Sequence, residues 1–81
     1  MNLRRYIEDQ ERSNILSGLL ISKLRKISSD EDFIAGVLLD VENDDDKKAL
    51  LNYIEAGQNV NYEQIILNAL WLYQQREKQA D

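Results

Sequence analysis

The chain has 81 residues and a formal net charge of −5, and it contains no cysteine and no histidine. A chain of this length holds one domain with one small core, and the missing residue types exclude disulfides, thiol nucleophiles, imidazole bases and Cys/His zinc sites, so we expect no enzyme. The N-terminal sequence MNLRRYIEDQ has no apolar leader and the longest apolar run is too short to cross a bilayer, so we expect a cytoplasmic protein without a membrane partner.

The first predicted element is one long helix over residues 2–27. Its apolar positions form two clusters separated by the polar stretch EDQERSN, and on a straight helix the two clusters face different directions. The alternative is a bend near Ser13 and Asn14, which are residue types that cap a second helix. We favour the continuous helix because the polar stretch consists mostly of good helix formers and Glu8–Arg12 is a favourable i,i+4 pair.

The apolar arc of this first helix is wider than one neighbouring helix would cover. Ile7, Ile15 and Ile21 widen it. A helix that is apolar on much of its circumference is either central to a bundle or shared between two protomers. Because dimerisation is an easy way to enlarge a small core, these three isoleucines are candidate interaction residues.

A short core helix is predicted next, over residues 30–42. Ser28 and Ser29 each precede an acidic residue at the spacing of a capping box, which marks a helix start. Gly36 lies inside this helix. Glycine is a costly choice there unless another backbone approaches closely.

A second short helix is predicted over residues 45–56, with Asn43 or Asp44 as its N-cap and Gly57 at its C-terminal end. The acidic residues that precede it suggest a calcium loop. Counted as an EF-hand from Asp40, however, the loop has aspartate where the turn needs glycine and leucine where the bidentate glutamate belongs. Acids are favourable at a helix N-terminus, so we expect no metal and no other cofactor.

The last predicted helix covers residues 61–78 and has the densest apolar pattern of the chain. Asn61 and Gln64 have the spacing of a capping box, and the tail from about residue 77 is expected to fray. Most of the apolar residues fall on one broad face at helical spacing. That face comprises Tyr62, Ile65, Ile66, Ala69, Leu70, Leu72 and Tyr73.

Leu67 and Trp71 lie together outside this broad face, four positions apart. One interpretation is burial against the long first helix, because tryptophan is usually buried to a large extent. The other is an exposed interaction site, because tryptophan is enriched among the residues that dominate binding energy. Both residues are therefore candidate interaction residues.

Together these patterns predict an all-α protein: a single domain over residues 1–81, folded as a small bundle of four helices. The first helix is long, the next two are short and the C-terminal one is longer. We expect a small acidic interaction or regulatory protein that acts through a helical surface, with a protein partner or as a homodimer.

The alternative function is nucleic-acid-related regulation, through a basic N-terminal helix or through acidic mimicry of a nucleic acid. The net negative charge repels phosphate, and the basic residues are spread along the first helix, so nucleic acid is the less favoured partner. These residues are Arg4, Arg5, Arg12, Lys23, Arg25 and Lys26.

Overall fold

The structure is a computed structural model that describes residues 2–57 and 60–79. Within these ranges it contains five helices and no strand. They are α1 (Leu3–Ser13), α2 (Ile15–Ile27), α3 (Glu31–Asp40), α4 (Asp44–Ala56) and α5 (Tyr62–Gln79). The all-α class is confirmed. The count of four helices is wrong, because the first predicted helix is two helices.

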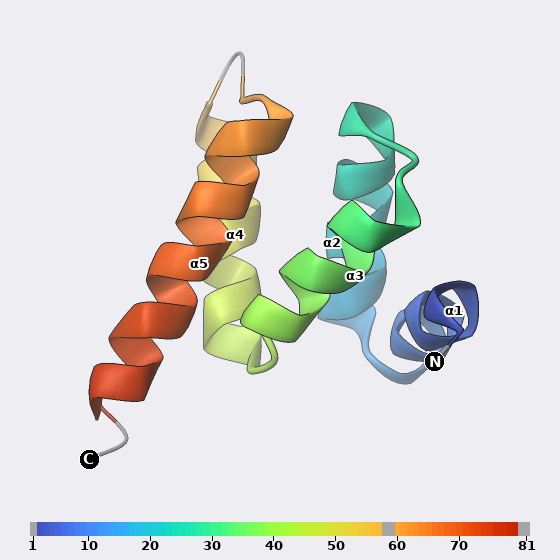
Figure 1. The fold of residues 1–81 in the computed structure, drawn as a ribbon, viewed down its shortest axis with the longest axis horizontal. Coiled ribbons are helices and arrows are strands. Elements are labelled where there is room, and N and C mark those ends of the chain that lie inside the picture. Colours follow the sequence, from blue (N-terminus) through green and yellow to red (C-terminus); the bar gives the residue numbers. More distant parts are fainter. Residues whose placement is uncertain (1, 58–59, 80–81) are drawn as a thin grey trace.

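The helices form two layers (Figure 1). In the nearer layer α3 lies between α1 and α5, and it contacts both. The farther layer holds α2 and α4, which also pack against each other. Further contacts of α2 with α1 and of α4 with α5 join the layers. Among the described residues, no helix is long and apolar enough to span a membrane.

Asn14 separates α1 from α2. Its backbone is extended, and its side-chain oxygen accepts hydrogen bonds from the backbone amides of Leu16 and Ser17, at 2.8 and 3.2 Å. Its Nδ2 donates to Oδ1 of Asp44, at the start of α4, over 3.1 Å. The continuous helix predicted over residues 2–27 is therefore wrong, and the alternative, a bend at this position, is correct.

The break allows both apolar clusters of the N-terminal segment to reach one core. Ile7 of α1 and Leu20 and Leu24 of α2 are all at most 2% exposed. A straight helix could not have buried both clusters against the same neighbours. The core comprises Ile7, Leu20, Ile21, Leu24, Phe33, Ile34, Ala35, Val37, Leu38, Val41, Leu50, Leu51, Ile65 and Ala69.

Two asparagine or aspartate caps start the short helices. Asp30, rather than either preceding serine, caps α3 and accepts a hydrogen bond from the amide of Asp32 at 3.0 Å. Asn43, one of the two predicted candidates, caps α4 and accepts from the amide of Asp46 at 2.7 Å. The acidic run is thus the first turn of α4, where the helix dipole favours carboxylates.

Gly57 ends α4 in an ordinary extended conformation, with φ −84°, so the left-handed C′ geometry typical of glycine is not used. The glycine has a steric reason instead, because a Cβ at this position would collide with the side chain of Val60.

The last helix, α5, continues to Gln79. Residues 77–79, assigned to the frayed tail, are therefore helical, and residues 80–81 lie outside the described residues.

Ser17 offers a test of packing within α2. It is fully buried, and its hydroxyl has no hydrogen-bond partner among the described residues. Because an unpaired buried hydroxyl is destabilising and alanine is the better helix former, we expect Ser17→Ala to raise the free energy of unfolding by about 1 kcal/mol. Urea denaturation measures this change. Ser22→Ala, on the exposed side of the same helix, is the control, and an equal effect of both substitutions would contradict the burial argument.

Candidate functional site

The candidate site lies on α5, whose first turn is held by local hydrogen bonds. Oδ1 of Asn61 accepts from the backbone amide of Gln64 at 2.9 Å, and Oε1 of Gln64 accepts from the backbone amide of Asn61 at 3.0 Å. The predicted capping box is confirmed. This reciprocal pair satisfies amides that the start of a helix otherwise leaves unpaired.

Only a narrow strip of α5 is buried. Ile65 and Ala69 are fully buried and Leu72 is half-buried, on the side where α5 packs against α3 and α4. Farther along this strip, Nη1 of Arg76 lies 4.0 Å from a carboxylate oxygen of Asp46 in α4. These contacts fix which side of α5 points away from the bundle.

The outward side of α5 carries large apolar side chains. Leu67 is 65% exposed and Trp71 is 53% exposed, so the interpretation that they are buried against the N-terminal segment is wrong. Leu70, predicted to lie on the buried face, is 40% exposed and lies between them in the sequence. From Gln64 to Gln75 the helix contains no charged residue, in a chain of which 31% is charged.

Tyr62 and Tyr73 were also predicted on the buried face, and both are about two-fifths exposed. They lie where α5 borders α3. A hydrogen bond to Glu77, and then the charge of that carboxylate, raise the pKa of Tyr73 above its ordinary value. A tyrosine hydroxyl is already neutral at neutral pH, and the raised pKa moves its ionisation further away. The charge next to Tyr73 is that of the Glu77 carboxylate.

The structure separates the three isoleucines that were predicted as interaction residues. Ile7 and Ile21 are 2% and 0% exposed and belong to the core, so their assignment to an interaction surface is wrong. Ile15 is 84% exposed. It lies on α2, which packs mainly against α1 and α4, so it is not part of the apolar side of α5.

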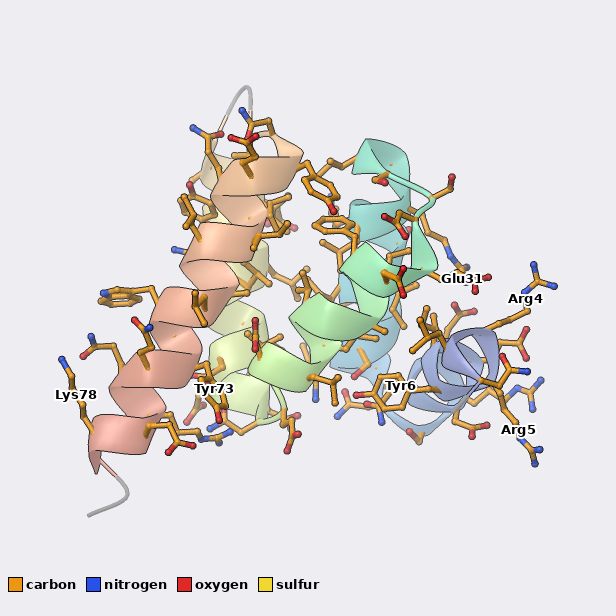
Figure 2. All side chains as sticks on the ribbon, in the orientation of Figure 1. Arg4, Arg5, Tyr6, Glu31, Tyr73 and Lys78 are labelled. Atoms are coloured by element: carbon orange, nitrogen blue, oxygen red, sulfur yellow. The ribbon has the colours of Figure 1, made fainter. Side chains whose placement is uncertain are left out.

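Three of the six basic side chains of the N-terminal segment face acidic ones. Figure 2 shows Arg4 directed toward Glu31, whereas Arg5 points away from the bundle. Exposed pairs of this kind contribute little stability, but each places a carboxylate beside a cation that a phosphate would otherwise contact. They do not favour a nucleic-acid surface. The pairs in this segment are Arg4–Glu31, Lys23–Glu55 and Arg25–Glu11, at 3.2, 3.9 and 3.2 Å.

Leu70 was missed as a surface residue, although a signal for it is present in the sequence. The charge-free stretch from Gln64 to Gln75 is longer than a half-buried helix needs, because the outer side of such a helix is normally polar.

Within the described part of the chain, no three acidic side chains come together as a metal site would require. No family model, curated protein or solved structure matches this chain.

Proposed function

We propose that this protein is a small, acidic, non-catalytic interaction protein that acts through the outward apolar face of α5 and forms a homodimer through it. The observation that supports this proposal is the exposure of Leu67, Leu70 and Trp71 on one side of α5, within a stretch from Gln64 to Gln75 that has no charged residue. Contiguous exposed apolar side chains are typical of interaction sites, and tryptophan is typical of their energetic centre. A second copy is a suitable partner because the single core of so short a chain is small.

The charges at the two ends of this face favour a second copy in antiparallel orientation. Glu63 and Lys78 are exposed and equally distant in sequence from the midpoint between Leu70 and Trp71. Helical periodicity places both on the same side as that pair, and Figure 2 shows Lys78 pointing away from the other helices. In an antiparallel pair, Glu63 of one protomer meets Lys78 of the partner subunit. A parallel pair would bring like charges together.

The proposal predicts that Leu67→Ala combined with Trp71→Ala converts a dimer into a monomer. Both side chains are exposed in the single chain, so the helical far-UV circular dichroism spectrum should be unchanged. Sedimentation velocity at high micromolar concentration measures the association state. Ile15→Ala is the matched control, because it removes an even more exposed apolar side chain from another helix and should leave the dimer intact.

A charge exchange tests the orientation separately. Lys78→Glu should weaken the dimer, and the additional substitution Glu63→Lys should restore it, because the opposite charges then face each other again. If the exchanged variant were weaker than Lys78→Glu alone, the antiparallel arrangement would be wrong. A wild-type protein that sediments as a strict monomer at high micromolar concentration would rule out the homodimer altogether.

A further inference from the structure

A second surface, on α3, is independent of the outward face of α5. After its first residue, α3 is buried on all sides except one strip, and five of its ten residues belong to the core. The helix lies in the middle of the nearer layer (Figure 1), and after Glu31 this strip is its exposed part. The strip comprises Asp32, Gly36, Leu39 and Asp40.

The strip borders a groove between α3 and α5 with a volume of about 400 Å³. Its floor is apolar and includes Phe33 and Val37, and Tyr62 of α5 lines the opposite side. The rings of Phe33 and Tyr62 lie against each other with their centroids 4.4 Å apart. Asp32 and Asp40 stand at the two ends, and no basic residue lines the groove. The groove is thus apolar in the middle and acidic at both ends.

Contacts among the described residues do not explain the glycine at position 36. It lies in the interior of α3, where glycine destabilises a helix relative to alanine. A Cβ built at this position would meet no atom of residues 2–57 and 60–79 within 4 Å, so none of these residues requires the missing side chain. Its effect is to leave the centre of the groove open to a close approach from outside.

The two carboxylates of the groove lack cationic neighbours. Among the described residues, neither Asp32 nor Asp40 has a basic group within 4.0 Å. Asp40 is the last residue of α3, where the helix dipole disfavours a negative charge. Burial also raises the pKa of Asp40, so the folded chain disfavours its ionised form. A cationic side chain of a partner protein would offset both the helix dipole and the burial, which disfavour the ionised form of Asp40.

We propose that this groove binds an amphipathic helix of a partner protein, with two basic residues about two turns apart and apolar residues between them. Asp32 and Asp40 are eight positions apart, which is about 12 Å along a helix. Basic side chains with the same spacing on a bound helix reach both carboxylates. The apolar side chains between them occupy the space above Gly36, which is the usual way in which an amphipathic helix fills a groove.

The test uses the full chain and a fluorescein-labelled, alanine-based helical peptide with two lysines eight positions apart and leucines between them. Fluorescence anisotropy should show saturable binding of this peptide and none of the same peptide with glutamate in place of lysine. Gly36→Leu, which fills the groove, should weaken binding by more than about tenfold. Gly36→Ala should weaken it less and should raise the melting temperature by roughly 2 to 6 °C, since it removes a helix-interior glycine.

Asp40→Asn and Asp9→Asn form a matched pair, because each removes one negative charge. Asp9 is exposed on α1, away from the groove, so only Asp40→Asn should weaken binding, by several-fold. Equal effects of the two substitutions would mean that net charge alone attracts the peptide. Absence of binding, or binding that is unchanged in a folded Gly36→Leu variant, would equally overturn the proposal.

The same assay separates this groove from the dimer face. The variant with Leu67→Ala and Trp71→Ala should bind the lysine peptide as the wild type does, whether or not the wild type is a dimer. If Gly36→Leu instead dissociated a dimer of the protein itself, a second copy would be the occupant of the groove and the partner helix proposed here would be wrong.

Discussion

Ile21→Ala is expected to lower the free energy of unfolding by about 2 to 5 kcal/mol, because the side chain is fully buried in the core and its truncation leaves a cavity. Ile15→Ala is the same substitution on the same helix. Ile15 is 84% exposed, and we expect its truncation to change stability by less than about 0.5 kcal/mol. For a domain of this size, each kcal/mol corresponds to a shift in melting temperature of about 4 to 8 °C.

Urea denaturation of the two variants measures the difference between their free energies of unfolding directly. The difference should be the same at low and at high protein concentration, because the contacts of Ile21 lie within one chain. A difference that grew with protein concentration would instead place Ile21 in an interface between chains. Equal stabilities of Ile21→Ala and Ile15→Ala would contradict the packing of α2.

Asn14→Ala is expected to destabilise the protein by about 1 to 2 kcal/mol, because it removes the side chain that caps α2. It also removes the hydrogen bond to Asp44 that joins α2 to α4. In a continuous helix over residues 2–27 the same substitution would have the opposite sign, since alanine is a better helix former than asparagine by about 0.5 kcal/mol. The direction of the change therefore distinguishes the two structures.

Asn14→Ser is the control for this prediction. Serine retains an oxygen that can cap α2 but lacks the Nδ2 amide group that donates to Asp44. We expect it to lose only a fraction of the stability that alanine loses, because the hydrogen bond to Asp44 is exposed. Chemical denaturation of the three proteins in parallel gives the comparison. A gain in stability for Asn14→Ala would contradict the break between α1 and α2.

Local signals were sufficient where a helix start depends on neighbouring residues only. The exchange of hydrogen bonds between Asn61 and Gln64, and the capping of α4 by Asn43, involve atoms no more than three residues apart. Such contacts form in the same way whatever surrounds the helix. The three predicted helices after residue 28 are accordingly observed within two residues of their expected ends.

The break at Asn14 could not be decided locally, because the polar stretch before it favours a helix by its propensities. On a continuous helix its two apolar clusters would face directions about 110° apart. Bending the chain buries Ile7 together with Leu20 and Leu24 in one core. Each such burial is worth about 1.5 to 3 kcal/mol, which exceeds the fraction of a kcal/mol per residue that helix propensity contributes. Tertiary packing therefore overrides propensity here.

Which residues of α5 are exposed also depended on tertiary packing. From the sequence alone, Leu67 and Trp71 stand apart from the main apolar face of α5, and this angular separation is a property of any helix. Periodicity could not show that the buried strip would be narrower than the apolar face, which leaves Leu70 exposed as well. That depends on α5 having two neighbours, α3 and α4. Ile15 and Ile21 show the same dependence on packing. Both belong to one apolar arc in the sequence, but Ile15 is exposed and Ile21 is buried, because of where other helices pack against α2.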